Sequence, residues 1–297
     1  MSILLAADFD AANRAAWLPA LRAALPGETL HLAADDHDDI DIAIVANPPA
    51  GVLQGLPQLK LVQSLWAGVD KLLRDPTVPA EVPLARMVDP AMNAAMAETA
   101  LWAALALQRG FFGYAAQQRA GAWRQHAQRR ADETRVAVLG LGQMGQAVAA
   151  RLAQQGLAVS GWSTRHGSVE TVLSDADIVI SLLPLTPATT GFFDRARFAQ
   201  MRRGAGFVNL ARGAQVVEAD LLAALEDGQL SHAVLDVFAT EPLPAGHAFW
   251  RHPKVTVLPH VAAQTDPRSA AQVVAANIRA LRSGQPLQHL VDRSRGY

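Results

Sequence analysis

The chain has 297 residues, of which 51% are hydrophobic and 18% are charged, with 26 Lys and Arg against 27 Asp and Glu. This length suits two domains, and the even balance of charge excludes a strong field that would recruit nucleic acid or an anionic membrane. The absence of cysteine excludes disulfides, thiolate metal sites and cysteine nucleophiles, and it favours the cytoplasm.

Short apolar runs alternate with helical stretches along the chain, a pattern typical of repeated βαβ units and a parallel sheet. The first third contains four candidate strands: ILLAA (3–7), IAIVA (42–46), LVQSL (61–65) and LARMV (84–88). We therefore expect a small doubly wound α/β domain at the beginning of the chain. The longest uncharged run, 42–59, holds three prolines and two glycines, so we expect no membrane helix there.

The stretch 90–119 is rich in Ala, Leu and Met and has no internal proline, which predicts one long helix leading out of the first domain. A second series of strands follows: RVAVL (135–139), LAVSGW (157–162), DIVISLL (177–183), GFVNLA (206–211), HAVLDVF (232–238) and VTVLP (255–259). A last helix after Pro267 would return to the first domain and stop near Gly284. The expected domains are therefore 1–98 with 268–297, and 99–267.

The first strand of the second series runs into GLGQMG, with Gly140, Gly142 and Gly145, and then into a helical stretch. Between a strand and a helix, G-x-G-x-x-G is typical of a loop that holds a dinucleotide pyrophosphate at a helix N-terminus. No Gly-Lys-Ser/Thr follows, which excludes a Walker A loop. The alternative is a glycine turn without a ligand.

The next strand ends in GWSTRHG, where an NAD-binding unit usually places an acid for the ribose 2′-OH. Ser163 stands at that position, followed by Thr164 and Arg165. Because no carboxylate repels a 2′-phosphate and a guanidinium can bind one, this loop favours NADPH over NADH. The alternative is that Arg165 is a solvated loop charge.

Three later strands end in polar segments: NLARG (209–213), LDVFATEPLP (235–244) and LPHVAAQT (258–265). Open α/β sheets bind their ligands at this carboxyl edge, so the three segments indicate a site. Considered one at a time, the polar residues of these segments could instead have structural roles. Arg212 could form a structural ion pair, Glu241 could be a loop acid before Pro242, and His260 could lie at the edge of a core.

Five motifs stand in a fixed order along almost the whole chain: GLGQMG, LLPLTPATTG, NLARG, LDVFATEPLP and PHVAA. In this order and spacing they resemble the D-isomer-specific 2-hydroxyacid dehydrogenases. Within that family, the chain looks most like the glyoxylate/hydroxypyruvate reductase A group. Three segments carry this closer resemblance: NLARGAQVVEADLLAAL, the Ser-Thr-Arg loop and the ending VDRSRGY. The resemblance implies a flavodoxin-like substrate domain, a Rossmann cofactor domain, and reduction of glyoxylate or hydroxypyruvate to glycolate or D-glycerate with NADPH in preference to NADH.

The resemblance also assigns Arg212, Glu241 and His260 as the catalytic residues. Reduction of a 2-oxo acid requires hydride at C2 and a proton on the carbonyl oxygen, and an imidazolium can supply that proton near neutral pH. A carboxylate beside it stabilises the imidazolium. A guanidinium binds the substrate carboxylate with its planar fork of donors and polarises the carbonyl.

Further contacts follow from the same resemblance. Trp66, Ala67 and Gly68 would bind the substrate together with Arg212 and His260, the turn offering its backbone amides to the substrate carboxylate. The alternatives are that Trp66 belongs to the core and that the loop is a simple strand-to-helix turn. Cofactor contacts would come from Gly140, Gly142, Gln143, Met144, Gly145, Ser163, Thr164, Arg165, Leu183, Pro184, Thr190, Ala211, Asp236 and Ala262. Asp236 would hold the nicotinamide carboxamide, although a buried acid could instead bind a neighbouring backbone amide.

His247 and His252 lie near His260 in sequence without a ligand pattern, so we expect surface histidines and no metal. The segment 90–119 with the following GAWRQHAQ resembles the family's dimerisation region, which implies a homodimer. The same Ala-rich helix and Trp123 could equally form internal packing. Two alternatives stay open. One is a 2-hydroxyacid dehydrogenase of different substrate, such as phosphoglycerate dehydrogenase, and the other is a dinucleotide-sensing binding protein without turnover.

Overall fold

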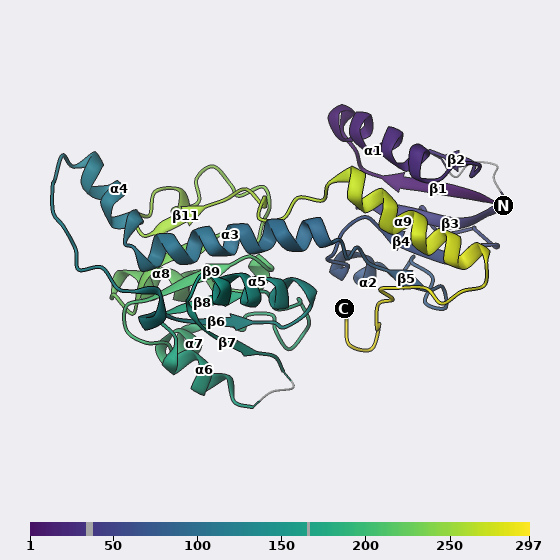
Figure 1. Cartoon of the computed structure of the whole chain (residues 1–297). Coiled ribbons are helices and arrows are strands. Elements are labelled where there is room, and N and C mark those ends of the chain that lie inside the picture. The colour runs from purple at the N-terminus through teal and green to yellow at the C-terminus, as the bar shows by residue number, and fades with distance from the viewer. Residues whose placement is uncertain (34–37, 165–166) are drawn as a thin grey trace. The chain divides into compact units, whose positions relative to one another are not determined.

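The computed structural model describes residues 1–33, 38–164 and 167–297 (Figure 1). It divides into two compact units, 1–92 with 265–297, and 93–264. Both divisions fall a few residues before those expected at 98/99 and 267/268. Within the described ranges, no helix is long and apolar enough to cross a membrane.

The first unit is built on a five-stranded parallel sheet in the order β2-β1-β3-β4-β5. Its strands are β1 (Ser2–Ala7), β2 (Leu30–His31), β3 (Ile40–Ala46), β4 (Leu61–Ser64) and β5 (Leu84–Ala85). This is the strand order of flavodoxin-like doubly wound sheets, in which the ligand crevice lies at the carboxyl ends of the strands. The sequence did not predict β2, because two residues are too few to show an apolar pattern.

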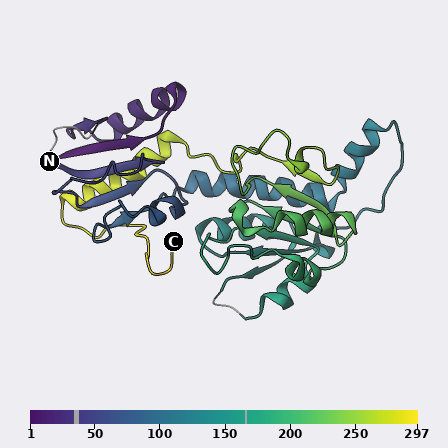
Figure 2. The ribbon, with the colours of Figure 1, turned by 180° about the vertical axis from the view of Figure 1, so that it is seen from behind.

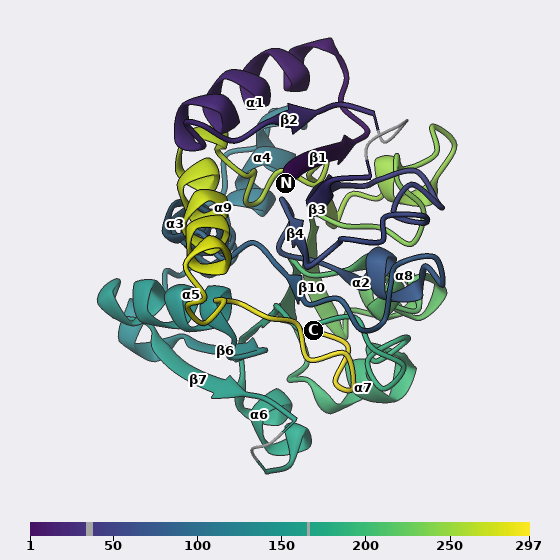
Figure 3. The same cartoon turned by 90° about the vertical axis from the view of Figure 1, so that its right-hand side faces the viewer.

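Helices α1 (Ala11–Ala24), α2 (Asp70–Arg74) and α9 (Pro267–Arg282) complete this unit (Figure 3). The last of them, α9, lies against α1 and joins the C-terminal part of the chain to the first unit. Its Arg282 forms ion pairs with Glu28 and with the buried Asp41 of β3. These pairs attach the end of α9 to both the loop after α1 and the sheet.

The second unit is built on a six-stranded parallel sheet in the order β11-β10-β9-β8-β6-β7. Its strands are β6 (Arg135–Leu139), β7 (Ala158–Trp162), β8 (Ile178–Ser181), β9 (Ala205–Asn209), β10 (Leu230–Leu235) and β11 (Val255–Val257). Its helices are α3 (Pro90–Gln108), α4 (Phe111–Arg119), α5 (Gln143–Gln154), α6 (Val169–Asp175), α7 (Arg195–Gln200) and α8 (Glu218–Glu226), with short 3-10 helices η1 (Ala131–Glu133), η2 (Gly213–Gln215) and η3 (Ala248–Trp250). Both sheets match the doubly wound α/β class expected from the sequence.

Alternation along the strands explains why helices cover both faces of this sheet (Figures 1 and 2). On β6, Val136 and Val138 join a core with α3 and α5, whereas Ala137 and Leu139 join a core with α6, α7 and α8. Because successive strand residues face opposite sides, a strand buried on both faces must be apolar throughout. The carboxyl edge of the sheet is then left for polar loops.

The stretch 90–119 does not form the single helix that the sequence predicted. It forms α3 and α4, and Gly110 between them has a left-handed backbone with φ of 68°. Glycine adopts this conformation without a steric penalty, so it ends one helix and lets the next leave in a new direction. Composition did not show the break because the long Ala- and Leu-rich run before Gly110 dominates the helix propensity of the stretch.

His232 of β10 should make folding sensitive to acid. It is buried, its Nε2 lies 2.9 Å from Thr256 Oγ1, and its ring stacks on Phe112 with centroids 4.0 Å apart. Burial, followed by the charge of His252, lowers the pKa of His232 from 6.5 to about 4. Between about pH 6.5 and pH 4 the unfolded chain therefore binds this proton more readily than the folded chain does. The free energy of unfolding is highest above about pH 6.5, and acidification to pH 4 lowers it by at most about 3 kcal/mol.

Denaturant unfolding at about pH 7 and about pH 5 measures this loss. His232→Gln keeps a hydrogen-bonding group for Thr256 but does not titrate in this range, so the free energy of unfolding should fall less with acid in the variant. Equal acid sensitivity in the two proteins would contradict the assignment.

Candidate active site

The glycine loop joins β6 to α5, and each of its three glycines meets a different constraint. Gly140 has φ of +101°, and a Cβ there would lie 2.4 Å from the Leu182 carbonyl oxygen. A Cβ on Gly145 would lie 1.7 Å from the Gly140 carbonyl oxygen, whereas one on Gly142 would meet nothing within 4 Å. The loop therefore packs closely at its ends and leaves open space at Gly142, where α5 begins, which fits a dinucleotide pyrophosphate.

Ser163 directly follows β7, as expected for the position that reads the cofactor ribose. Ser163 is partly exposed and Thr164 is exposed. Arg165, the predicted partner of a 2′-phosphate, lies outside the described residues.

The loop after β8 is held by its own hydroxyl groups. Thr189 is buried, and its Oγ1 donates to the Pro184 carbonyl at 2.6 Å and accepts from the Thr186 amide at 2.8 Å. Thr190, which the sequence suggested as a cofactor contact, donates to the Thr186 carbonyl at 3.0 Å. Thr189 is therefore the residue that holds the loop together. The sequence alone did not show which of the two adjacent threonines, Thr189 or Thr190, points into the loop.

The Arg212 turn follows β9 and is shaped by Asn209, which is fully buried. Asn209 Oδ1 accepts from the Ala211 amide, and its Nδ2 donates to the Arg212 carbonyl, both at 3.1 Å. A Cβ on Gly213 would lie 1.8 Å from the Phe238 carbonyl carbon. Gly213 therefore places the Arg212 turn directly against the backbone that leads to Glu241.

The structure brings Glu241 and His260 into contact. His260 Nδ1 lies 2.7 Å from Glu241 Oε2, and the other carboxylate oxygen, Oε1, accepts from the Phe238 amide at 2.9 Å. Both side chains are partly exposed, at 51% for His260 and 36% for Glu241. Nδ1 must donate to a carboxylate, so Nε2 is the ring nitrogen left to exchange a proton with another molecule.

Asp236 holds the backbone around His260. Its carboxylate accepts from the amides of Val261 at 2.7 Å and Ala262 at 3.0 Å, while the Asp236 carbonyl accepts from the His260 amide at 2.9 Å. Burial raises the pKa of Asp236, against the opposing effect of those two amides. His260 has a left-handed backbone with φ of 55°, a costly conformation for a residue with a side chain, and these three bonds keep it in place.

In the first unit, the predicted substrate turn follows β4. Ser64 Oγ accepts from the Trp66 amide and donates to the Trp66 carbonyl, both at 3.0 Å. The Trp66 ring packs edge-on against Trp17 with centroids 6.0 Å apart. Ala67 and Gly68 follow at the carboxyl end of the strand, the edge where doubly wound sheets bind ligands.

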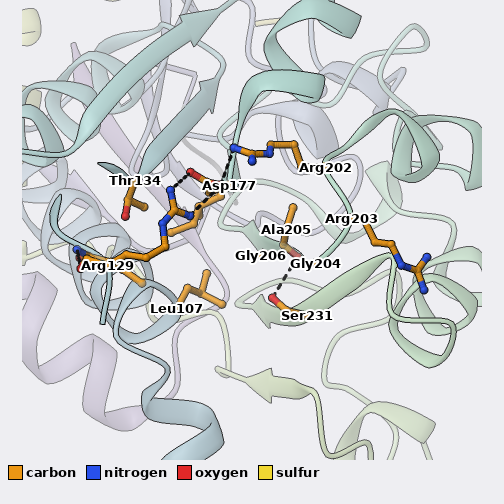
Figure 4. A pocket seen from close by; sticks show the side chains of 12 residues that line it. Leu107, Arg129, Thr134, Asp177, Arg202, Arg203, Gly204, Ala205, Gly206 and Ser231 are labelled. Atoms are coloured by element: carbon orange, nitrogen blue, oxygen red, sulfur yellow. Dashed lines mark hydrogen bonds and ion pairs between the residues drawn. The ribbon is translucent and has the colours of Figure 1, made fainter. Parts of the chain in front are cut away.

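A hollow of about 300 Å³ lies at the opposite, amino edge of the second sheet (Figure 4). Asp177 there accepts from Arg129 at 3.0 Å and from Arg202 at 2.9 Å, while Arg203 points away from it. The carboxylate neutralises part of the positive charge, so this hollow is lined by an ion-pair network. It includes the amino ends of β9 and β10, the strands whose opposite ends lead to Arg212 and Glu241.

Of the two histidines near His260 in sequence, His247 has Nε2 3.2 Å from Glu218 Oε2, and His252 accepts from the Lys254 amide through Nδ1. In the part of the chain that the structure describes, no group of three His, Cys, Asp or Glu residues could hold a metal ion.

Comparison with known proteins identifies the family of the chain. Residues 101–262 match the model of the D-isomer specific 2-hydroxyacid dehydrogenase NAD binding domain, which is more than half of the chain. The chain belongs to the D-isomer-specific 2-hydroxyacid dehydrogenase family. The matched range contains the glycine loop and the exits that carry Arg212, Glu241 and His260.

Relatives of this dehydrogenase family cover the whole chain. A glyoxylate/hydroxypyruvate reductase A from Serratia proteamaculans is 41% identical over 96% of this chain and 97% of that protein. The structure of a Xanthobacter autotrophicus family member in complex with NADPH has a TM-score of 0.94 at 38% identity, covering 100% of this chain and 99% of that one. An NADPH-dependent glyoxylate/hydroxypyruvate reductase from Sinorhizobium meliloti, in complex with NADP and sulfate, has a TM-score of 0.93 at 35% identity, covering 100% of both chains.

Proposed function

We propose that this chain is a reductase that uses NADPH in preference to NADH to convert glyoxylate or hydroxypyruvate into glycolate or D-glycerate. The observation that carries the proposal is the 2.7 Å contact between Glu241 and His260 at the exits of a sheet whose glycine loop has room for a pyrophosphate. The similarity to the reductases of Serratia proteamaculans and Sinorhizobium meliloti supports the substrate class.

In this proposal, each of three side chains has one task. His260 donates a proton from Nε2 to the carbonyl oxygen of the substrate, because Nδ1 is engaged by Glu241. Glu241 stabilises the imidazolium and fixes its orientation. Arg212 binds the substrate carboxylate and polarises the carbonyl. Bound NADPH supplies the hydride to C2.

Glu241→Gln tests the pair without removing the histidine. The amide can still accept from the Phe238 amide, but it carries no charge to stabilise an imidazolium. We expect kcat to fall about 10- to 100-fold, because a hydrogen bond to a charged group usually stabilises the charged state by about that factor. Steady-state kinetics with glyoxylate at saturating NADPH measures this loss.

Glu218→Gln is a matched control, because Glu218 faces His247 at 3.2 Å in the same unit and belongs to no predicted site. Its kcat should stay close to that of the wild type. A similar loss in both variants would mean that the Glu241 effect is a general cost of breaking a Glu–His pair.

We further propose that the cofactor lies along the carboxyl edge of the second sheet. The residues assigned to it are Gly140, Gly142, Gln143, Met144, Gly145, Ser163, Thr164, Arg165, Leu183, Pro184, Thr190, Ala211, Asp236 and Ala262. Two of these assignments need refinement. The two oxygens of Asp236 already accept backbone amides, so a carboxamide would share an oxygen that has a second lone pair. The Thr190 hydroxyl already donates within its loop, which leaves it as an acceptor.

A comparison of kcat/KM for glyoxylate, hydroxypyruvate, pyruvate and phenylpyruvate, each with NADPH and NADH, tests the proposal. We expect the first two substrates and NADPH to be preferred. Higher efficiency with another 2-oxo acid would favour a dehydrogenase of different substrate. Cofactor binding with negligible turnover on all four would favour a dinucleotide-sensing protein. Equal efficiency with both cofactors would contradict the assignment of Ser163 and Arg165.

We propose that the first unit contributes the substrate turn of Trp66, Ala67 and Gly68.

We also propose that two chains form a homodimer in the cytoplasm. Support for the dimer comes from large apolar side chains exposed on and after α3: Trp102 at 44%, Phe111 at 52% and Trp123 at 93%. Exposed apolar groups of this size are typical of an interface. Light scattering on the purified protein measures its mass directly.

A further inference from the structure

Gln215 joins two loops that the proposed function assigns to different ligands. It lies on η2, three residues after Arg212, and its side chain is fully buried. Its Nε2 donates to two consecutive carbonyls, those of Leu183 at 2.9 Å and Pro184 at 3.0 Å. Only the amide NH₂ can donate to both oxygens, so the chemistry fixes which way the amide points.

The backbone on either side strengthens this junction. The Gly191 amide donates to the Ala214 carbonyl and the Phe193 amide to the Gln215 carbonyl, both at 2.9 Å. These bonds hold the far end of the loop after β8, whereas the Gln215 side chain holds its beginning. The loop after β8 and the turn after β9 are therefore joined at both ends. Gln215 joins the turn to Leu183 and Pro184, and the Pro184 carbonyl also accepts from Thr189 of its own loop.

Core packing alone does not explain an amide here. Among the described residues, Gln215 Oε1 is buried without a hydrogen-bond partner, which costs stability. A Met of similar length would fill the space without that cost but could not hold the two carbonyls. A local loss of stability of this kind is typical of a residue that has a role in a functional site.

We propose that Gln215 is a positioning residue that holds the Leu183–Pro184 backbone in place for the cofactor and couples it to the Arg212 turn that receives the substrate carboxylate. This inference rests on the proposed function. Gln215 itself touches neither ligand. Its loss should therefore weaken both cofactor and substrate binding, because one side chain supports both loops.

The test compares Gln215→Met with Gln229→Met. Gln229 makes the same kind of contact, donating through Nε2 to the carbonyls of Phe198 at 3.0 Å and Met201 at 2.7 Å, but it stands before β10 at the opposite edge of the sheet. Both variants lose two hydrogen bonds to carbonyls, so both should melt at a lower temperature. Only Gln215→Met should bind NADPH about tenfold more weakly and show a higher KM for glyoxylate.

Binding of NADPH in the absence of substrate is measured by titration of its fluorescence, and KM and kcat by steady-state kinetics. Equal NADPH affinity and equal KM in the two variants would overturn the inference and leave Gln215 a structural residue. If instead the wild type bound NADPH but reduced no 2-oxo acid, the proposed function would fail independently of Gln215. The two failures are therefore distinguishable.

Gln215→Glu provides a second readout and carries the test if Gln215→Met does not fold. An ionised carboxyl at this position cannot donate and repels both carbonyl oxygens, whereas a protonated one donates to one of them. The NADPH affinity of this variant, relative to wild type at the same pH, should therefore improve as the pH is lowered from about 8 to about 6. A ratio independent of pH would contradict the positioning role.

Discussion

Replacement of His260 with Gln is expected to lower kcat for glyoxylate by about 100- to 10,000-fold, the range usually contributed by a general acid. The amide side chain fills much of the same space and can still hydrogen-bond to Glu241, but it cannot deliver a proton to the developing alkoxide. NADPH binding should be unchanged, because the glycine loop and α5 lie at other strand exits of the sheet. Stopped-flow or steady-state rates, with a fluorescence titration of NADPH, separate the two properties.

His247→Gln is the matched control for this prediction. His247 also lies beside a carboxylate, with Nε2 3.2 Å from Glu218, but it precedes η3 and belongs to no predicted site. It should keep nearly full activity. If His260→Gln turned over at the wild-type rate, another group would have to be the proton donor.

The inner strands of the sheets were predictable from the sequence because they are buried on both faces. Such strands read as continuous apolar runs, and RVAVL and DIVISLL are typical examples. The break at Gly110 was not predictable, because a glycine inside a helix-forming stretch can be tolerated, and only its left-handed backbone shows that the helix ends there. Local composition thus identifies elements better than it identifies the point where one turns into the next.

The contact between Glu241 and His260 could be anticipated because parallel strands end at the same edge of a sheet. The residues that hold this site were missed. Asn209 shapes the Arg212 turn and Gln215 binds the loop after β8, but each is a single polar residue near a motif. Asn209 bonds an amide and a carbonyl of its own turn, whereas Gln215 reaches two carbonyls more than 30 residues earlier, and no pattern of spacing in the sequence shows which backbone group a buried amide will reach. Asp236 was named from the sequence, with a backbone amide as its alternative partner, but the sequence did not show that its oxygens meet the amides of Val261 and Ala262 some 25 residues later.

Replacement of Arg212 with Ala is expected to lower kcat/KM for glyoxylate by about 1,000-fold, because a bidentate, charge-assisted contact to the substrate carboxylate is lost. The fold should be unaffected. Asn209 holds the turn through the Ala211 amide and the Arg212 carbonyl, and these bonds remain in the variant. The variant loses the bond that the Arg212 guanidinium donates to the Ala211 carbonyl at 2.7 Å. Thermal unfolding should therefore change little while KM rises and kcat falls.

Arg212→Lys distinguishes charge from geometry at the same position. A lysine keeps the positive charge but loses the planar fork, so its kcat/KM should lie between those of the wild type and Arg212→Ala. Guanidinium ion added to Arg212→Ala should restore part of the rate, since the small cation can occupy the vacated space and present the same fork to the carboxylate. Equal activity of Arg212→Lys and the wild type would show that charge alone suffices. An unchanged KM in Arg212→Ala would place the carboxylate on the backbone amides of the first unit and leave Arg212 only the polarisation of the carbonyl.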